Sequence, residues 1–322
     1  MKKIFITANL PGDSVEILKE NFDIEIFPYR RSPTREELIR GARNCSALVT
    51  MVTDNIDKDV INSSDELEII SNCGVGYENI DIEHATKRGV YVTNTPGVLT
   101  EATADLAWSL ITSVARRVLE GDRLIREGEF INWEPTLLLG QNIYDKTLGI
   151  YGMGRIGNSI ARRAKGFNMN IFYHNRNRNA DAEKLTNARY VDFTTLLNKS
   201  DYIVISAPLN AQSAGRFGAD EFRQMKKTSI IINVGRGKII NENDLAEALE
   251  KNEIWGAGLD VFENEPVVSD KLLKLKNTVL LPHLGSASYE TRCTMSEMAI
   301  CDVLKVLDGK TPVNPVNKLH LN

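Results

Sequence analysis

The chain has 322 residues, of which 42% are apolar and 25% charged, and its formal net charge is −4. Because a single hydrophobic core rarely extends beyond about 250–300 residues, this length favours two domains. The small acidic excess argues against a surface that coats nucleic acid, and no apolar run approaches the ~18 residues of a membrane span. The four cysteines form no CxxC pair and do not gather with the four histidines. This predicts reduced thiols in a cytoplasmic protein and no metal site.

Short β-rich runs alternate with helical stretches in the first part of the chain. This βαβα order predicts a parallel sheet wrapped by helices. Thr34 is suited to cap one helix, because Glu37 stands at the capping-box position. The expected strands are 3–8, 24–27, 47–51, 67–72 and 90–93, and the expected helices are 14–21 and 34–41.

After Gly97 the pattern changes to one long apolar-periodic stretch over 100–117. A helix of that length more often joins domains than lies within a small one. The strand–helix alternation then restarts, so we expect a second α/β unit. Periodicity does not decide whether the last helical segment, 288–307, returns to the first unit. The second unit is expected to contain strands 147–151, 170–173, 202–206, 230–233, 256–259 and 279–281, and helices 156–165 and 243–251.

A glycine-rich turn links the strand 147–151 to the following helix. Its sequence is GMGRIG over 152–157, and a GxGxxG motif is informative when it follows a strand and opens a helix. Gly152 permits the tight turn, Gly154 lets the backbone approach a pyrophosphate, and Gly157 lets helix and strand pack closely. The helix N-terminus then offers N–H groups and a positive dipole to the phosphates. A plain glycine turn is the less favoured alternative.

The end of the next strand indicates which dinucleotide binds. An NAD site has an Asp or Glu about 20 residues beyond the glycines, for the ribose 2′-hydroxyl. This chain has Asn175, Arg176 and Arg178 there, and guanidinium groups pair with a 2′-phosphate. We therefore predict NADP, with NAD as the weaker alternative. A solvated basic strand end is the structural alternative.

Three residues follow strands in the C-terminal half: Arg236 between two glycines, Glu265 before a proline, and His283 after an apolar run. Each alone has an ordinary explanation, as a turn residue, a solvated carboxylate or a packed histidine. Downstream of a dinucleotide loop they make the set needed to reduce a 2-keto acid. The arginine would hold the substrate carboxylate and polarise the carbonyl. The histidine would donate a proton, and the carboxylate would orient and charge the imidazole.

These motifs, taken in order, resemble the D-isomer-specific 2-hydroxyacid dehydrogenases over nearly the whole chain. The matching segments are 72–81, 94–97, 101–105, 152–157, 233–237, 258–261, 265–266 and 282–283. The resemblance implies an α/β fold of two Rossmann-like domains with parallel sheets. A cofactor domain, 99–286, would be inserted into a smaller flavodoxin-like substrate domain made of 1–98 and 287–322.

The resemblance also implies roles for individual residues. Arg236, Glu265 and His283 match the catalytic arginine, glutamate and histidine, with His283 as general acid/base. Val75 and Gly76 match a loop whose N–H groups bind the substrate carboxylate, and the expected substrate-binding residues are Val75, Gly76, Arg236 and His283. The expected cofactor-binding residues are Thr103, Gly152, Gly154, Arg155, Ile156, Gly157, Asn175, Arg176, Arg178, Ala207, Pro208, Val234, Gly235, Asp260 and Gly285.

Within the family, the strand end 173–176 looks like that of NADP-using glyoxylate/hydroxypyruvate and 2-ketogluconate reductases. The implied partner is a small 2-keto or 2-hydroxy acid, with no nucleic acid or membrane, and members are usually homodimers embraced by an arm near 133–140. Two features depart from the pattern: the segment 211–217 after Pro208, and Leu137 where some reductases have a tryptophan. The alternative function is that of the family's dinucleotide-sensing corepressors, which need no proton relay.

Overall fold

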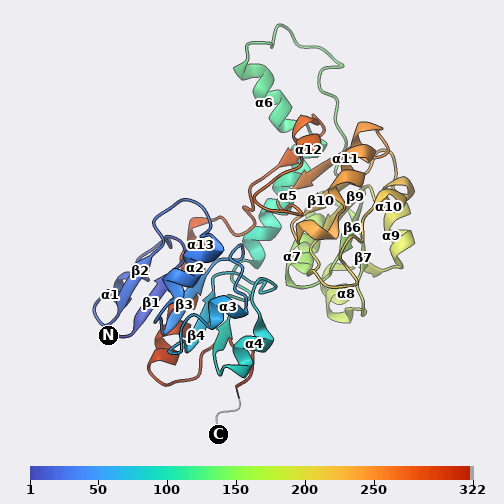
Figure 1. Ribbon diagram of the computed structural model, residues 1–322. Coiled ribbons are helices and arrows are strands. Elements are labelled where there is room, and N and C mark those ends of the chain that lie inside the picture. Colours follow the sequence, from blue (N-terminus) through green and yellow to red (C-terminus); the bar gives the residue numbers. More distant parts are fainter. Residues whose placement is uncertain (320–322) are drawn as a thin grey trace. The chain divides into compact units, whose positions relative to one another are not determined.

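Figure 1 shows the computed structural model, in which residues 1–319 are described. The chain separates into two units, Met1–Leu99 together with the segment that begins at Ala287, and Thr100–Ser286. Each unit contains one sheet in which every strand pair is parallel. The expected α/β fold with two parallel sheets is confirmed.

The first unit has a five-stranded sheet in the order β2-β1-β3-β4-β5, which is the flavodoxin-like order. The central strands β3 and β4 are buried along their whole length, because helices cover both faces of a parallel sheet. Its strands are β1 (Lys3–Ile6), β2 (Asp23–Ile26), β3 (Ala47–Thr50), β4 (Ile69–Asn72) and β5 (Tyr91–Thr93). Its helices are α1 (Glu16–Lys19), α2 (Arg35–Ala42), α3 (Lys58–Ile61), α4 (Ile82–Lys87) and α13 (Tyr289–Leu307).

The C-terminal segment completes this first unit, which periodicity alone could not decide. Helix α13 packs against β3 and β4, where Ala299, Ile300 and Val303 join the core of the sheet. Beyond the helix, the Asn317 side chain accepts the Val92 N–H at 2.8 Å and donates to the Val90 carbonyl at 2.9 Å. The tail thus satisfies backbone groups at the edge strand β5.

The second unit has a seven-stranded sheet in the order β12-β11-β10-β9-β6-β7-β8. From β6 the chain adds β7 and β8 on one side of the sheet, and it then adds β9 to β12 on the other side. This is a doubly wound sheet with its switch point between β6 and β9. Its strands are β6 (Thr147–Tyr151), β7 (Asn170–His174), β8 (Arg189–Tyr190), β9 (Tyr202–Ile205), β10 (Ile230–Asn233), β11 (Gly256–Leu259) and β12 (Thr278–Leu280). Its α-helices are α5 (Thr100–Ala115), α6 (Val118–Arg126), α7 (Arg155–Ala164), α8 (Ala180–Thr186), α9 (Phe193–Lys199), α10 (Ala219–Gln224), α11 (Glu242–Glu250) and α12 (Asp270–Lys274).

The long helix α5 begins at the first residue of the second unit, directly after the first unit ends, and forms part of the second unit's core. It packs against α7, β10 and β11. Small residues such as Ala104 and Ala107 are fully buried on its inner face, and they let the helix approach the sheet closely. The Trp108 indole donates to the Ile160 carbonyl at 3.1 Å and stacks on Phe167.

Several short elements are absent from the sequence-based prediction, among them α3, α4, α6, α8, α9, α10, α12 and β8. Elements of two to nine residues carry too few apolar positions for a clear period. Among the helices within residues 1–319, none is both long and apolar enough to span a bilayer.

Candidate active site

The glycine turn between β6 and α7 is shaped for close backbone approach. Gly152 has φ 106°, and a Cβ there would lie 2.5 Å from the Ala207 nitrogen. A Cβ at Gly157 would lie 2.3 Å from the Gly152 carbonyl oxygen. By contrast, nothing lies within 4 Å of a Cβ built on Gly154, the N-cap of α7, which has no side-chain cap. The geometry therefore leaves open space at an uncapped helix N-terminus, which fits the pyrophosphate of a dinucleotide.

A cavity of about 430 Å³ adjoins this turn. It lies at the carboxyl ends of β6, β7 and β9, on both sides of the switch point, where doubly wound sheets bind their ligands. No aspartate or glutamate lines it, but two arginines do. The lining residues are Tyr151, Gly152, His174, Asn175, Arg176, Asn177, Ala207, Pro208, Asn210, Gln212, Ser213 and Arg216.

The three polar residues predicted at the end of β7 have different environments. The Asn175 side chain accepts the Met153 N–H at 2.6 Å and so ties the strand end to the glycine turn. Arg176 is exposed and lines the cavity. Arg178 does not line the cavity, and both arms of its guanidinium donate to Glu183 at 2.7 Å. That pairing, with a further bond from Tyr173, lowers the pKa of Glu183 to about 2.

Arg216 is a cavity residue that the sequence analysis did not assign. Its guanidinium lies 3.6 Å from the centroid of the Phe193 ring, a cation–π contact that orients the side chain. Its position in the chain could have identified it as a cavity residue, because the segment 211–217 follows β9, and the carboxyl ends of β9 and β6 lie at the same edge of the sheet. Tyr151, His174, Asn177, Asn210, Gln212 and Ser213 were not predicted either.

A histidine–carboxylate pair lies beyond the ends of β11 and β12. His283 Nδ1 donates to Glu265 Oε2 at 2.7 Å, since an ionised carboxylate only accepts hydrogen bonds. Glu265 Oε1 accepts the Phe262 N–H at 3.0 Å. Burial opposes ionisation of Glu265, but the hydrogen bond and charge of His283 outweigh it and hold the pKa of Glu265 below its usual value. The ring of His283 keeps its other nitrogen without a partner within residues 1–319, and the side chain is 36% exposed.

Arg236 lies in the loop after β10, close to this pair. Its charge is among the causes that lower the pKa of Glu265. The loop is shaped by Asn233, whose side chain donates to the Arg236 carbonyl and accepts the Gly235 N–H, both at 3.0 Å. A Cβ at Gly237 would lie 1.9 Å from the Phe262 carbonyl. The backbones of the arginine loop and the glutamate loop are therefore in direct contact, which only a glycine permits.

Asp260 holds the loop that carries His283. Its backbone carbonyl accepts the His283 N–H at 3.0 Å, and its two carboxylate oxygens accept the N–H groups of Leu284 at 2.6 Å and Gly285 at 2.8 Å. His283 itself has φ 53°, a left-handed conformation that is costly for a residue with a Cβ. Three hydrogen bonds from one residue hold that conformation. Thr103, also predicted at the cofactor, is buried with its hydroxyl 3.4 Å from a Cβ built on Gly285.

The remaining predicted cofactor residues lie along the same sheet edge. Ala207 and Pro208 line the cavity. Gly235, which follows Val234, packs on the backbone of the β9 loop, since its Cβ would lie 2.9 Å from the Ala207 carbonyl oxygen. Arg155 and Ile156 form the first turn of α7. Val75 and Gly76, in contrast, belong to the first unit, in the loop after β4.

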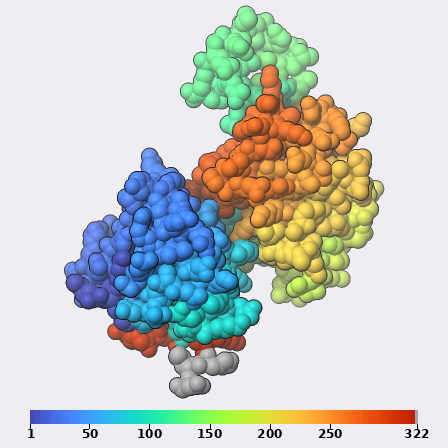
Figure 2. Space-filling view, viewed as in Figure 1, coloured from blue at the N-terminus to red at the C-terminus, as the bar shows by residue number. Residues whose placement is uncertain are grey.

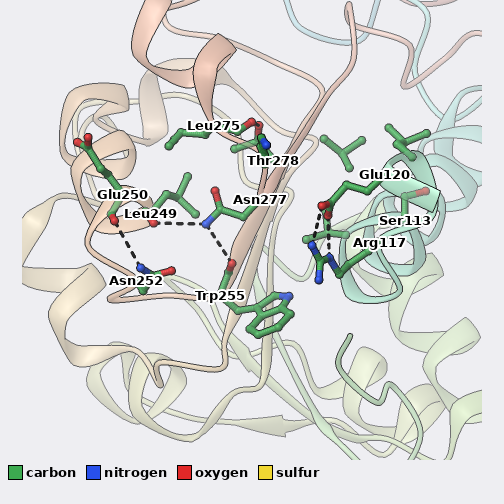
Figure 3. Close-up of a pocket in the computed structure, with 14 residues that line it drawn as sticks. Ser113, Arg117, Glu120, Leu249, Glu250, Asn252, Trp255, Leu275, Asn277 and Thr278 are labelled. Atoms are coloured by element: carbon green, nitrogen blue, oxygen red, sulfur yellow. Dashed lines mark hydrogen bonds and ion pairs between the residues drawn. The ribbon is translucent and has the colours of Figure 1, made fainter. Parts of the chain in front are cut away.

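A second cavity of about 380 Å³, shown in Figure 3, does not involve these residues. Asn277 and Trp255 at its wall precede β12 and β11, so it adjoins the amino ends of strands whose carboxyl ends lead to His283 and Glu265. Several of its polar groups are paired with one another. Asn277 donates to the carbonyls of Leu249 and Trp255, and Arg117 donates twice to Glu120. No histidine is among its lining residues.

Comparisons with known proteins place the chain among related sequences. A family model described as "D-isomer specific 2-hydroxyacid dehydrogenase, NAD binding domain" matches residues 108–285. A protein named glyoxylate reductase from Thermococcus litoralis is 46% identical over 98% of this chain and 97% of its own length.

Solved structures are also similar. One from Thermus thermophilus has 37% identity and a TM-score of 0.93, with 98% of this chain and 100% of that chain covered. An NADPH-dependent glyoxylate/hydroxypyruvate reductase from Sinorhizobium meliloti, solved with NADP and malonate, has 31% identity and a TM-score of 0.86. That comparison covers 98% of this chain and 96% of the reductase.

Asp260 should make stability depend on pH. Burial raises its pKa to about 6 from an ordinary value of 3.8, against the lowering effect of its hydrogen bonds and of His283. Between these two pH values the folded state binds more protons than the unfolded state. The stabilising contribution of Asp260 is therefore complete below about pH 4 and is lost as pH rises through about 6. Asp260→Asn removes the titration. We expect the unfolding free energy of the variant, relative to wild type, to rise by up to about 3 kcal/mol from pH 4 to pH 7. Denaturant titrations at both pH values measure it, and a constant difference would contradict the assignment.

Proposed function

The chain belongs to the D-isomer-specific 2-hydroxyacid dehydrogenase family, whose members are oxidoreductases, and we propose that it reduces short 2-keto acids to D-2-hydroxy acids. Glyoxylate and hydroxypyruvate are the leading substrates, and 2-ketogluconate follows. The observation that carries the proposal is the 2.7 Å hydrogen bond between Glu265 and His283, beside the loop of Arg236. Together these groups meet the chemical needs of carbonyl reduction.

His283 is proposed as the proton donor to the carbonyl oxygen. The Glu265 carboxylate fixes the ring orientation through Nδ1 and stabilises the charged imidazolium. The opposite nitrogen then faces the substrate oxygen with a proton to give. In the reverse direction the same nitrogen accepts the hydroxyl proton, so one residue serves as acid and base.

Arg236 is proposed to hold the keto-acid carboxylate and polarise the carbonyl. A guanidinium stays protonated at all working pH values and presents a planar fork that matches a carboxylate. Its positive charge also stabilises the negative charge that develops on the carbonyl oxygen. The contact between Gly237 and Phe262 keeps this loop beside the loop of Glu265.

The second unit is proposed as the cofactor domain, and the first as the substrate domain. The fit rests on the open space above Gly154 and on the cavity that joins β6, β7 and β9. A bound reduced nicotinamide dinucleotide supplies the hydride that reaches the carbonyl carbon. The N-terminus of α7 would hold the pyrophosphate, and Thr103 and Asp260 would lie near the nicotinamide end. The four cysteines are free thiols, which supports a cytoplasmic location.

The direct test is loss of NADPH absorbance with a panel of keto acids. We expect rapid oxidation with glyoxylate or hydroxypyruvate by the wild type. In His283→Ala, kcat should fall about 10²–10⁴-fold, the usual contribution of general acid catalysis, with NADPH affinity within about twofold. The matched control is His84→Ala, because His84 lies on the surface of the first unit and bonds to Asn62. Dinucleotide binding without turnover by the wild type would instead support a sensor, and unchanged kcat in His283→Ala would remove this residue from the mechanism.

NADPH is the proposed coenzyme. Support comes from the cavity lining, which has Arg176 and Arg216 but no carboxylate. A carboxylate there would accept a ribose 2′-hydroxyl and repel a 2′-phosphate, whereas arginines attract the phosphate. Arg178 is a weaker candidate than the sequence indicated, because Glu183 occupies its guanidinium.

Arg176→Ala should lower kcat/KM for NADPH by at least about tenfold and leave NADH nearly unaffected, since a hydrogen bond to a charged group contributes about 1.5–3 kcal/mol. Arg178→Ala should have a smaller effect on the same ratio. Initial rates with both coenzymes provide the comparison. A wild type that prefers NADH would refute the coenzyme proposal without affecting the reaction type.

A homodimer is the proposed assembly. Helix α6 has no buried residue, and the segment after it carries large exposed apolar side chains, including Ile131 at 94% and Trp133 at 74% exposure. Figures 1 and 2 show α6 and this segment extending away from the sheet of the second unit. Apolar surface of this kind is typical of a protein–protein interface, and the family resemblance assigns the arm near 133–140, which follows directly, to contact with a second copy.

Ile131→Glu should weaken the dimer by placing a charge in its apolar contact, so the sedimentation coefficient should shift to that of a 36.0 kDa monomer. Leu185→Glu is the control, because Leu185 is also an exposed aliphatic residue, at 55% exposure, but lies on the separate helix α8. A wild type that sediments as a monomer at micromolar concentration would refute the dimer.

A further inference from the structure

Three successive carbonyl groups in the loop after β4 are held by donors from the sheet edge. The Gly74 carbonyl accepts the Thr95 N–H at 2.9 Å. The Val75 carbonyl accepts the Asn94 side-chain N–H at 2.7 Å, and the Gly76 carbonyl accepts that of Asn72 at 2.6 Å. The donors come from the ends of two adjacent parallel strands, β4 and β5.

This arrangement determines where the loop's N–H groups point. In a trans peptide the N–H of each residue points opposite to the preceding carbonyl, and the one cis bond found within residues 1–319 is Glu265-Pro266. The N–H groups of Val75, Gly76 and Tyr77 therefore point away from the donors that hold the carbonyls. Within the described chain none of the three has an acceptor. Such a row of unpaired N–H groups is an anion-binding arrangement.

The amides that hold the loop are themselves fixed. Asn72 is fully buried, and its side-chain oxygen accepts the Thr50 hydroxyl at 3.3 Å, so both ends of its amide are engaged. At the far end of the loop, the Asn79 side chain donates to the carbonyls of Met51 at 3.1 Å and Asp54 at 2.8 Å. The loop is thus anchored to the ends of β3, β4 and β5 before any ligand binds.

Space around the loop is equally restricted. A Cβ at Gly74 would lie 2.2 Å from Val52 Cγ1, so a side chain at this position would collide with Val52. Preorganised donors cost little conformational entropy on binding, which increases affinity. This rigidity is what a site for a small carboxylate requires.

We propose that Asn72 and Asn94 are positioning residues that aim three N–H groups, those of Val75, Gly76 and Tyr77, at the carboxylate of the keto-acid substrate. The inference rests on the proposed function and extends it in two ways. It adds the Tyr77 N–H to the two loop residues that the family resemblance implied. It also assigns the orientation of all three donors to asparagine side chains that do not touch the substrate.

The consequence is a specific kinetic signature. Without Asn94, the peptide between Val75 and Gly76 loses the bond that fixes its plane, and its N–H no longer points consistently at the ligand. Carboxylate binding weakens in the ground state and the transition state alike, so KM rises while kcat changes little. The proposed proton donor, His283, and the dinucleotide turn lie in the other unit and keep their own supports.

The test compares wild type, Asn94→Ala and the control Asn62→Ala in the full-length protein. Asn62 is an exposed asparagine of the same unit whose side chain accepts from Arg88 and makes no bond to the loop. Three quantities are measured: KM and kcat for glyoxylate, KM for NADPH, and the dissociation constant of oxalate for the enzyme–NADP⁺ complex by calorimetry. Oxalate carries the same carboxylate as glyoxylate but no reducible carbonyl.

For Asn94→Ala we expect about a tenfold rise in both KM for glyoxylate and Kd for oxalate, with kcat and KM for NADPH within about twofold. Tenfold corresponds to about 1.4 kcal/mol. The control should match wild type. If Asn94→Ala is unstable, Asn94→Ser, whose shorter side chain does not span the distance to the Val75 carbonyl, replaces it.

Two results would overturn the inference: Kd and KM unchanged in Asn94→Ala while its melting temperature falls, or a wild type that binds no oxalate. The first would show that the asparagines only stabilise the loop. Failure of the proposed function is separate and visible in the wild type, as oxalate binding without turnover of any keto acid. In that case the calorimetric comparison still decides the role of Asn94.

Discussion

The position of His283 depends on the buried carboxylate of Asp260. Without the two hydrogen bonds that the Asp260 carboxylate accepts from the N–H groups of Leu284 and Gly285, the left-handed conformation at His283 would lack compensation. The same strand, β11, leads within a few residues to both Asp260 and Glu265. One strand end thus supplies the residue that shapes the histidine loop and the residue that orients the histidine ring. The burial that this support requires also raises the pKa of Asp260 to about 6.

Parallel strand order brings these groups together. Arg236, Glu265 and His283 follow β10, β11 and β12, which are neighbours in the sheet. Since carboxyl ends of parallel strands share one edge, residues about 20–30 positions apart in sequence become neighbours in space. Glycines then allow the loops to touch. Gly237 meets Phe262, and Gly235 meets the backbone of the β9 loop, so the reacting groups stand on backbone in direct contact rather than on separate flexible loops.

The first unit uses the same principle with a different chemistry. Its loop after β4 is bonded to the ends of β3 and β5 by amide side chains. Neutral donors are suited to this task, because they fix carbonyl oxygens without adding a charge beside a bound carboxylate. Each unit is proposed to hold its own binding groups, backbone N–H donors in the first and a guanidinium with an imidazole in the second.

Long and strongly patterned elements were predictable from the sequence. The strands 147–151, 230–233 and 256–259 agree with β6, β10 and β11, and the predicted capping box of Thr34 and Glu37 is present in α2. These features depend on local apolar runs and on residues three positions apart. Short helices such as α3 and α9 were missed, because their formation depends on packing against the sheet rather than on periodicity.

The residues of the candidate site also divide into those that the sequence predicted and those that only the structure revealed. The motif positions of Arg236, Glu265 and His283 could be read in the chain, and so could the glycine turn. The pairing of Arg178 with Glu183, the placement of Arg216 over Phe193 and the support of His283 by Asp260 could not. Each of these joins residues from different loops, and loop conformations are not encoded by a period.

The amino-acid sequence by itself thus determined the α/β class, the main strands, the glycine turn and which side chains are proposed to react. Only the tertiary structure decided which arginines line the cavity beside the glycine turn, that the C-terminal helix packs on the first sheet, and which way the loop amides point. The physical reason is the distance along the chain over which each interaction acts. Propensity and patterning act over a few residues, whereas a hydrogen bond such as that from Asn94 to Val75 exists only after separate strands have paired.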